Sequence, residues 1–281
     1  MARHQHHKGN ADSQTLSPSQ RYASFQKVQR HRASAAARFA ESLPFELDDF
    51  QTEANDALEA GSNVLVAAPT GAGKTVVADF AIYLAQERNV KAFYTTPIKA
   101  LSNQKYHDLV DVYGPDKVGL LTGDTSINSE ADIVVMTTEV LRNMLYERST
   151  TLNALRYVIL DEVHYLADRF RGPVWEEVII HLPKTVKIVG LSANVEDFSN
   201  WIASVRGDTK LVISEHRPVP LEQHVIVQAD EYTEPEVLDL YRRDGNGEQA
   251  TKLNAELINR LDQLDRKAAR RRGEERPDKR K

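Results

Sequence analysis

The chain has 281 residues, of which 41% are hydrophobic and 27% charged, and its formal net charge is -5. That length suits one large domain or a domain with appendages, and the hydrophobic content supports an ordinary core. The chain contains no cysteine, which excludes a disulfide framework and a thiolate metal site, and no apolar run approaches the roughly 18 residues of a membrane span. Its polar start lacks the apolar stretch of a signal peptide, so we expect an intracellular protein without a membrane span.

Charge is distributed unevenly along the chain. The first 40 residues carry seven Lys/Arg and one Asp, and the last 16 carry nine Lys/Arg and three Asp/Glu. Each end is therefore net +6, and the segment between them is net -17. Two basic ends on an acidic body are compatible with nucleic-acid binding, but basic termini are more often simply solvated, so charge alone does not identify a partner.

The N-terminal region predicts a tail followed by a helix. Residues 1–18 are polar and are expected to form a flexible tail. Over residues 19–43 we expect a helix that ends before Pro44. Its apolar residues recur at roughly helical spacing, namely Tyr22, Phe25, Val28, Ala35, Ala36 and Phe39.

Strand-like and helix-like segments alternate from residue 63 onward. Short, almost continuously apolar runs predict strands over residues 63–69, 91–97, 117–123, 132–138, 155–162 and 186–193. Longer segments predict helices over residues 73–88, 99–113, 139–148, 172–182 and 195–204. This βαβ alternation predicts an α/β fold of three layers, in which helices cover both faces of a mostly parallel sheet. Functional sites in such folds lie at the carboxyl ends of the strands.

The pattern changes beyond residue 228, and residues 229–281 are expected to form a linker and a helical basic tail. Residues 242–249, RRDGNGEQ, predict a loop. Residues 252–272 predict a helix, and four leucines would share one of its faces: Leu253, Leu257, Leu261 and Leu264. The charged ending, GEERPDKRK, is expected to be disordered.

The segment AAPTGAGKT, residues 67–75, predicts a phosphate-binding loop, because it follows a strand and opens a helix. Gly71 and Gly73 let the backbone turn so that its N–H groups point at phosphate oxygens. Lys74 is expected to contact the β- and γ-phosphates of ATP, and the Thr75 hydroxyl to hold Mg2+. A chance glycine-rich turn is the alternative, and the strand–loop–helix context argues against it.

A second candidate motif ends the buried strand in YVILDEVHYLAD, residues 157–168. In a sheet with a phosphate loop, Asp161 can coordinate Mg2+ and Glu162 can orient and deprotonate the attacking water. The alternative is a solvated pair of carboxylates that merely ends the strand. His164 alone would usually be a structural histidine.

These motifs together resemble the first RecA-like domain of a superfamily-two helicase of the DExH group. More narrowly, the chain is similar to the superkiller-type RNA helicases, including their actinobacterial relatives, over about residues 40–228. FELDDFQTEA resembles the adenine-recognising Q motif, with Phe45 as the aromatic residue and Gln51 as the amide. APTGAGKT resembles motif I and DEVH motif II, in which His164 couples the nucleotide site to motif III. The resemblance places the nucleotide against the loop residues Pro69, Thr70, Gly71, Ala72, Gly73, Lys74 and Thr75.

The resemblance also implies a surface for single-stranded RNA. TTPIKALSNQKY is similar to motif Ia, and TGD and TTEVLRNML resemble the strand-gripping motifs that follow it. Amides, a lysine and hydroxyls at these strand ends can hold phosphates without reading bases. The residues expected to do so are Pro97, Lys99, Ala100, Thr122, Gly123, Asp124, Thr137 and Thr138. DRFRGPVWEEVIIHLP and EHRPVPL are similar to later segments of the same subgroup.

Two departures from the family pattern concern motif III and the end of the chain. The family reads Ser-Ala-Thr where this chain reads Ser192, Ala193 and Asn194, and the segment that follows is a few residues short. We interpret this as a short deletion or an unrecorded gap after Ala193 rather than a Thr-to-Asn substitution. Coupling of hydrolysis to strand movement would be altered as a result. The chain also ends where a second RecA-like domain is expected, together with the arginine that completes the site in the family.

The sequence thus predicts the N-terminal ATP-binding domain of an ATP-dependent RNA helicase, weakly active by itself and located in the cytoplasm. Two alternatives remain open. The first is a DNA helicase of the same superfamily. The second is a truncated, non-catalytic RNA-binding module, which would bind RNA without responding to ATP.

Overall fold

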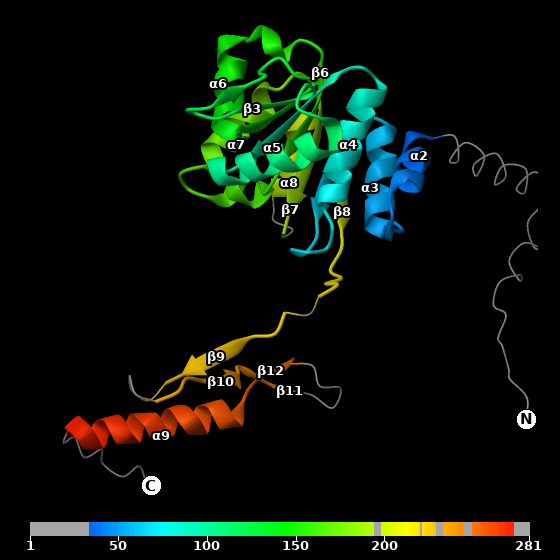
Figure 1. Cartoon of the computed structure of the whole chain (residues 1–281). Helices are drawn as coiled ribbons and strands as arrows, with labels where there is room; N and C mark the ends of the chain where they lie inside the picture. Colours follow the sequence, from blue (N-terminus) through cyan, green and yellow to red (C-terminus); the bar gives the residue numbers. More distant parts are fainter. Residues whose placement is uncertain (1–33, 194–197, 220, 229–232, 244–248, 273–281) are drawn as a thin grey trace, which may run out of the picture. The chain divides into compact units, whose positions relative to one another are not determined.

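The computed structural model describes residues 34–193, 198–219, 221–228, 233–243 and 249–272. The chain divides into two compact units, Met1–Pro218 and Val219–Lys281, which are described separately (Figure 1). Across the described residues, no helix is long and apolar enough to cross a membrane. Residues 1–33, which include most of the tail and helix expected at the N-terminus, lie outside the described residues.

The described residues of the first unit form eight strands and a set of helices that alternate with them. The strands are β1 (Asn63–Ala67), β2 (Lys91–Thr96), β3 (Val118–Leu121), β4 (Ser126–Ile127), β5 (Ile133–Thr137), β6 (Leu155–Leu160), β7 (Lys187–Ser192) and β8 (Thr209–Ile213). The α-helices are α2 (Ala35–Ser42), α3 (Asp49–Glu59), α4 (Thr75–Glu87), α5 (Lys99–Tyr113), α6 (Thr138–Glu147), α7 (Gly172–His181) and α8 (Phe198–Arg206). Two short 3-10 helices are η1 (Thr150–Leu152) and η2 (Val163–Ala167).

All eight strands join one sheet in the order β4-β3-β5-β2-β6-β7-β1-β8. Every neighbouring pair is parallel except β3 and β4, which are antiparallel. The expected α/β fold with a mostly parallel sheet is therefore confirmed. Because the strands are parallel, the segments that follow β1, β2, β6 and β7 all leave the same edge of the sheet.

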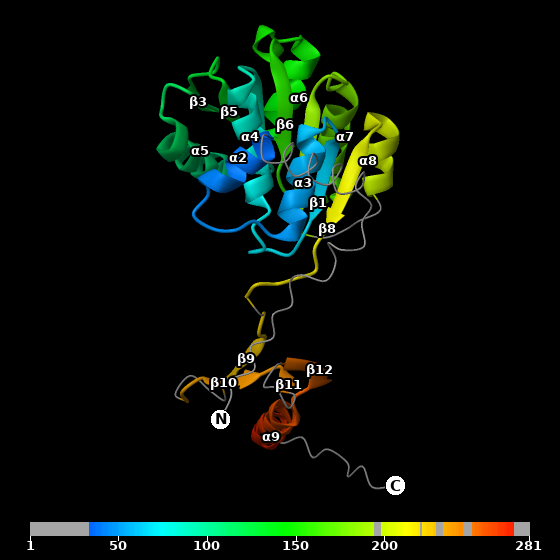
Figure 2. The same ribbon diagram turned by 90° about the vertical axis from the view of Figure 1, so that its right-hand side faces the viewer.

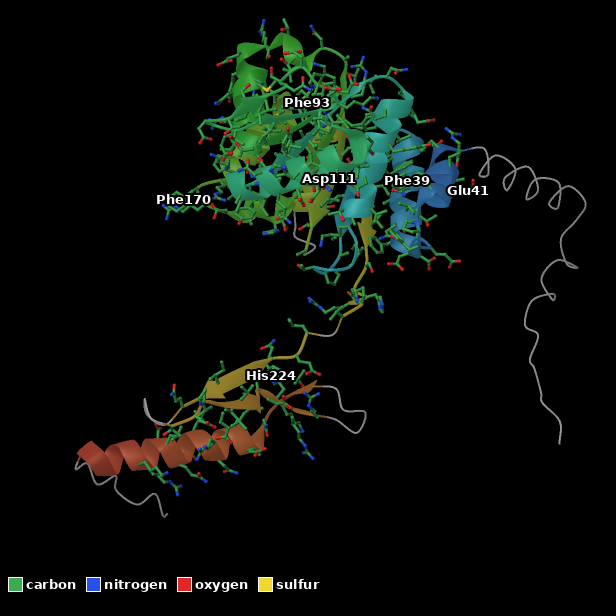
Figure 3. The ribbon with its side chains drawn as sticks, in the orientation of Figure 1. Phe39, Glu41, Phe93, Asp111, Phe170 and His224 are labelled. Carbon is green, nitrogen blue, oxygen red and sulfur yellow. The ribbon has the colours of Figure 1, made fainter. Side chains whose placement is uncertain are left out.

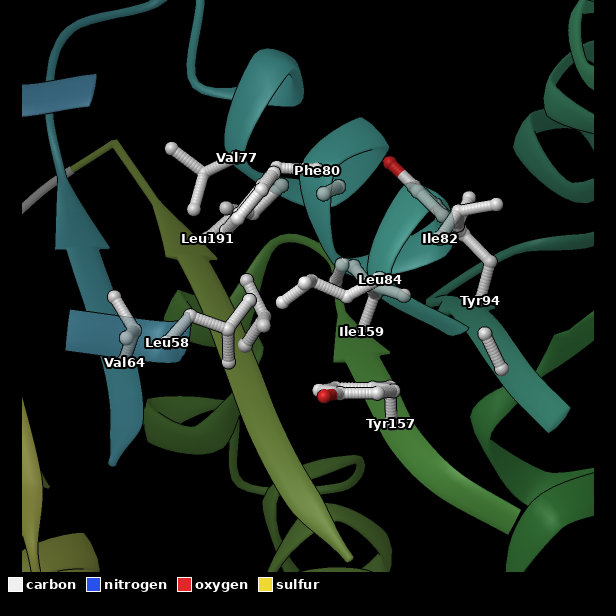
Figure 4. Packing of buried hydrophobic residues seen from close by; sticks show 14 of the residues in the cluster. Leu58, Val64, Val77, Phe80, Ile82, Leu84, Tyr94, Tyr157, Ile159 and Leu191 are labelled. Atoms are coloured by element: carbon white, nitrogen blue, oxygen red, sulfur yellow. The ribbon is translucent and has the colours of Figure 1, made fainter. Parts of the chain in front are cut away.

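Helices cover both faces of the sheet and make three layers (Figures 1 and 2). Neighbouring side chains of β2 serve opposite layers: Tyr94 packs in the cluster with α2, α3, α4 and α5, and Phe93 packs in the cluster with α6, α7 and α8. Figure 4 shows part of the first of these clusters, with Ile82 of α4 beside Tyr94 and Leu84 of α4 beside Ile159 of the sheet. Alternation along a strand thus supplies both halves of the core.

Helix α2 is attached to the domain by backbone hydrogen bonds as well as by its apolar face. The amides of Ala35 and Ala36, in its first turn, donate to the two carboxylate oxygens of Glu59 at 2.8 and 3.0 Å. Phe39 is buried and packs against the rings of Phe80 and Tyr83 on α4. The segment before the site is therefore held against α3 and α4.

In the second unit, the residues that the structure describes form two antiparallel pairs of strands and a helix. The pairs are β9 (His224–Val227) with β10 (Glu236–Asp239), and β11 (Tyr241–Arg243) with β12 (Gln249–Leu253). Helix α9 (Ala255–Arg272) follows. The expectation that Leu253 shares a helical face was wrong, because Leu253 lies in β12 and pairs with Tyr241 of β11. The side chain of Asn254 then accepts the Glu256 amide at the start of the helix. Leu257 is buried and Leu261 is exposed.

Candidate active site

The loop between β1 and α4 has the backbone of a phosphate-binding turn. Gly71 and Gly73 have φ angles of +85° and +82°, a region that side chains rarely tolerate. A Cβ atom at Gly73 would also lie 2.7 Å from Nε2 of Gln51. The turn therefore favours glycine at position 73, and a larger residue there would also displace the Gln51 amide.

Lys74 closes this loop with its own side chain. Its Nζ atom donates to the carbonyl oxygens of Ala68 at 2.6 Å and Pro69 at 3.0 Å. Burial lowers the pKa of Lys74, while the charges of Glu162 and Asp161 raise it and the charge of Arg217 lowers it further. These charges act on Lys74 because the end of β6 and the segment after β8 lie beside the loop, so the structure brings the two predicted motifs together.

Both oxygens of the Asp161 carboxylate accept hydrogen bonds from the protein. Oδ1 accepts the backbone amide of Glu162 at 3.0 Å, and Oδ2 accepts the hydroxyl of Tyr94 at 2.8 Å. The backbone amide of Asp161 donates to the carbonyl of Thr95 at 3.0 Å. The carboxylate is thus held in one orientation at the carboxyl end of β6.

Glu162 occupies the left-handed region, with a φ angle of +57°, which is uncommon for a residue with a side chain. Glu162 lies between β6 and η2 and is the N-cap residue of η2. Its Oε2 lies 3.2 Å from Nδ1 of His164, close enough for an ion pair but not aligned as a hydrogen bond. Glu162 and His164, two residues of the predicted DEVH motif, are therefore neighbours.

Gln51 connects the Q-motif segment to the phosphate loop. Its side chain is buried; Nε2 donates to the carbonyl of Gly73 at 3.0 Å, and Oε1 accepts the amide of Asp48 at 2.9 Å. Phe45 is half-exposed and lines a hollow of about 630 Å³ between α2 and α3. A second hollow of about 330 Å³ lies beside Ala72 of the loop.

The expected strand-binding residues follow β2, β3 and β5 at the same edge of the sheet. Lys99 and Ala100 are exposed at the start of α5, whereas Pro97 before them is buried. Lys99 forms a salt bridge with Asp124, and Thr122 donates to the other oxygen of that carboxylate at 3.0 Å. Gly123 is exposed beside them.

The turn after β5 presents less of its side chains than the sequence suggests. Thr137 is half-buried, and Thr138 is fully buried with its hydroxyl donating to the Thr96 carbonyl at 3.4 Å. Of the proposed coupling residues, Ser192 ends β7, and its carbonyl accepts the amide of Ala68. Ala193 is half-buried, and Asn194 lies outside the described residues.

Sequence reasoning missed two residues of the site. Tyr94 falls inside a predicted core strand, and its hydroxyl reaches a residue 67 positions away. The available signal was its chemistry, because a buried tyrosine hydroxyl usually has a partner and its strand runs beside the one that ends in DEVH. Arg217 belongs to the EHRPVPL segment and lies close enough to affect Lys74, which its sequence position does not reveal.

A further charged cluster lies behind Tyr94. Lys105 of α5 bonds Asp79 of α4 at 3.3 Å, and its Nζ lies 5.1 Å from the centre of the Tyr94 ring. Burial raises the pKa of Asp79, and Lys105 opposes that shift. This cluster connects the helix after the phosphate loop, the helix after β2 and the tyrosine that contacts Asp161.

Known proteins share both the motifs and the fold. Residues 48–200, more than half of the chain, match the family model described as DEAD/DEAH box helicase. The chain is 56% identical over 250 residues to the probable helicase HelY of Mycobacterium tuberculosis, covering 85% of this chain and 27% of that protein. It is 51% identical over 190 residues to the antiviral helicase SKI2 of Saccharomyces cerevisiae, covering 66% of this chain and 15% of that one.

Among solved structures, the chain is similar to the helicase Lhr of Mycobacterium smegmatis bound to ssDNA and AMP-PNP, with a TM-score of 0.51 and 27% identity over 64% of this chain and 27% of that one. The chain spans about a quarter or less of the length of the two curated relatives. The order of the motifs, the geometry of the loop and these matches show that the chain belongs to the DEAD/DEAH box helicase family and is related to the Ski2-type helicases.

Proposed function

We propose that this chain provides the ATP-binding domain of a helicase that couples ATP hydrolysis to movement along single-stranded RNA. The observation that carries the proposal is the arrangement around Lys74. Its ammonium group in the phosphate loop lies close enough to Asp161 and Glu162 for their charges to raise its pKa. A cation and a turn of backbone amides can bind the phosphates of a nucleoside triphosphate, and two carboxylates can hold Mg2+ and position the attacking water. The activity of a longer protein with this domain is part of the proposal.

The triphosphate would lie on the loop between β1 and α4. Its backbone amides and the N-terminus of α4 offer positive charge to phosphate oxygens. Lys74 would exchange its hydrogen bonds to two loop carbonyls for bonds to the β- and γ-phosphates. The half-exposed ring of Phe45 would contact the adenine, and Gln51 would hold the loop in place through Gly73.

Mg2+ fits the chemistry of the side chains beside this loop. The Asp161 carboxylate and the exposed Thr75 hydroxyl are hard oxygen donors, and Mg2+ is usually held by one or two such groups together with phosphates and water. When bound, the ion would neutralise part of the phosphate charge. Tyr94 and the Glu162 amide would keep the Asp161 carboxylate oriented for it.

Glu162 is the residue proposed to position and deprotonate the attacking water. Its backbone is left-handed at the end of β6, and Nδ1 of His164 lies 3.2 Å from its carboxylate. In the DExH resemblance an arginine from a second RecA-like domain completes the site. We therefore expect slow hydrolysis by this chain alone, because that arginine stabilises the transition-state charge.

The single-stranded nucleic acid would cross the edge of the sheet that is formed by the segments after β2, β3 and β5. Lys99 supplies a cation there and the turn backbones supply amide donors, which favours contact with phosphates rather than bases. RNA is proposed because the motifs are most similar to those of superkiller-type RNA helicases. DNA is the second candidate, because the structure of the similar helicase Lhr holds ssDNA.

The test is the rate of ATP hydrolysis in the presence of oligouridylate or oligodeoxythymidylate, measured for the unmodified chain and for Glu162→Gln. We expect stimulation by the RNA strand, and loss of hydrolysis with retained ATP binding in the variant. Equal rates for the two proteins would contradict the role of Glu162. Stronger stimulation by the DNA strand would favour the second candidate. An affinity for RNA that does not change when ATP is added would identify a non-catalytic module.

A further inference from the structure

Phe170 is exposed to an unusual degree for an aromatic residue. It follows η2, and 84% of its surface is accessible, more than for any other large hydrophobic residue among the described parts of the chain. Figure 3 shows its side chain projecting from the outer edge of the first unit. Single exposed hydrophobic side chains are common on protein surfaces, so it is the turn and the charges around this ring that indicate a partner.

The turn that presents Phe170 is fixed by hydrogen bonds. The Asp168 carboxylate accepts the backbone amides of Phe170 at 2.9 Å and Arg171 at 2.8 Å, and the Asp168 carbonyl accepts the amide of Gly172 at 2.8 Å. A Cβ atom at Gly172 would lie 2.4 Å from the carbonyl oxygen of Leu166, so the turn requires glycine there. The ring is therefore displayed by an ordered turn rather than by a loose loop.

Arg171 connects this turn to the proposed strand surface. Its guanidinium lies 5.1 Å from the centre of the Tyr165 ring and donates to the carbonyl of Pro97 at 3.4 Å. Pro97 is followed two residues later by Lys99, the exposed cation at the start of α5. Phe170 is thus one residue from a side chain that contacts the segment proposed to hold phosphates.

The charges around Phe170 favour a polyanion over an apolar partner. Arg169 and Arg171 flank it, and the Arg169 guanidinium lies 6.0 Å from the centre of the Phe170 ring. The one carboxylate in the turn, Asp168, already accepts two backbone amides, which lower its pKa. Aromatic rings beside arginines are a common platform for unpaired bases, because every base has a π-face and every phosphate is negative.

We propose that Phe170 stacks against a base of the single strand whose phosphates lie along Pro97 and Lys99, and that Arg169 and Arg171 contact the adjoining phosphates. The inference rests on the proposed function, because it assumes that this edge of the sheet holds a strand. The proposed stacking adds a contact to the face of a base. Such a contact does not discriminate between base sequences or between ribose and deoxyribose. A protein surface that covers Phe170 is the competing occupant.

The experiment compares the binding of two fluorescent strands of about ten nucleotides, one of oligouridylate and one with abasic sites at every position. Anisotropy titrations are made with the unmodified chain, Phe170→Ala, Phe170→Trp and the control Tyr146→Ala. Tyr146 is also an exposed aromatic residue, but it ends α6 at the opposite edge of the sheet. Circular dichroism checks that each variant is folded.

We expect Phe170→Ala to weaken oligouridylate binding by about tenfold and to leave binding of the abasic strand unchanged. Phe170→Trp should retain the affinity, and its indole fluorescence should fall when the oligouridylate strand binds. Tyr146→Ala should match the unmodified chain with both strands.

Equal oligouridylate affinities for the unmodified chain and Phe170→Ala would overturn the stacking contact. Such a result would favour a protein surface as the occupant that covers Phe170. Equal losses for both strands would also overturn it, because the ring would then be acting on phosphates. If the unmodified chain binds neither strand nor ATP, the proposed function fails as well, so the two failures are distinguishable.

Discussion

The hydroxyl of Tyr94 donates a 2.8 Å hydrogen bond to Oδ2 of Asp161. Tyr94 is buried in β2, and burial, together with the charge of Asp161, raises its pKa well above the ordinary value, so the hydroxyl keeps its proton and remains a donor. The other oxygen of Asp161 accepts the Glu162 amide. The carboxylate proposed to hold Mg2+ is therefore oriented by the protein itself, before any ligand contributes.

Tyr94→Phe should separate this orienting role from folding. We expect the variant to lose about tenfold of the ATP affinity measured with Mg2+, because a hydrogen bond to a charged group contributes about 1.5 kcal/mol. ATP binding in EDTA should be unchanged. Isothermal titration calorimetry with and without Mg2+ measures both values.

Tyr157→Phe is the matched control for that experiment. Tyr157 is also buried and bonds a charged side chain, Arg88 at 2.5 Å, but it lies near the start of β6, away from the site. It should leave ATP binding unchanged. An equal loss of affinity in the two variants, or equal losses with and without Mg2+ in Tyr94→Phe, would contradict the orienting role.

Gln51→Ala should loosen the phosphate loop. The substitution removes the hydrogen bonds to the Gly73 carbonyl and from the Asp48 amide, so we expect the free energy of unfolding to fall by about 1 to 2 kcal/mol and ATP affinity to fall several-fold. Chemical denaturation and ATP titration provide the two measurements. Gln104→Ala, at an exposed position of α5, should change neither value. Unchanged affinity in Gln51→Ala would show that the loop does not depend on this contact.

Lys99→Ala should weaken strand binding through phosphate contacts alone. We expect a similar loss of affinity for oligouridylate and for the abasic strand, and a decrease of about one in the slope of log affinity against log salt concentration. Asp124→Asn removes the carboxylate that pairs with Lys99 and should raise strand affinity. Titrations at several salt concentrations check both variants, and a loss confined to oligouridylate in Lys99→Ala would contradict the phosphate role.

Asp124 should also affect stability at acidic pH. The hydrogen bonds from Lys99 and Thr122 lower the pKa of the Asp124 carboxyl below its unfolded value. Its contribution to stability is therefore complete above the unfolded pKa and is lost as the pH falls through the lower folded value. In urea denaturation between about pH 5 and pH 2.5, Asp124→Asn should lose less stability than the unmodified chain. If the free energy of unfolding falls with pH equally in the two proteins, Asp124 makes no such contribution to stability.

The sheet and its motifs could be predicted from sequence because the signals are local. Apolar runs mark the buried parallel strands, and the segment from residue 67 to 75 contains its own turn, cation and helix start. The exposed pairs β9–β10 and β11–β12 were not predicted, and neither was the two-residue strand β4. These strands are short and only partly buried, so their apolar runs are too brief to identify them from sequence.

Contacts within the site were harder to predict because they depend on distant parts of the chain. Gln51 was expected to hydrogen-bond the adenine. In the structure its Nε2 donates to the Gly73 carbonyl and its Oε1 accepts the Asp48 amide. The Tyr94 contact with Asp161 depends on the pairing register of β2 and β6. Sequence identifies which groups gather at the edge of the sheet, whereas the register decides which of them touch.

ATP binding by Lys74→Ala tests the central claim most directly. Calorimetry with Mg2+ and ATP should be carried out on the unmodified chain, on Lys74→Ala and on Arg156→Ala, an exposed residue in the first half of β6, away from its carboxyl end. We expect the unmodified chain and Arg156→Ala to bind ATP equally, and Lys74→Ala to lose at least about tenfold in affinity, because its cation contacts the phosphates. Equal affinity for ATP in all three proteins would contradict the proposal that this loop is the nucleotide site.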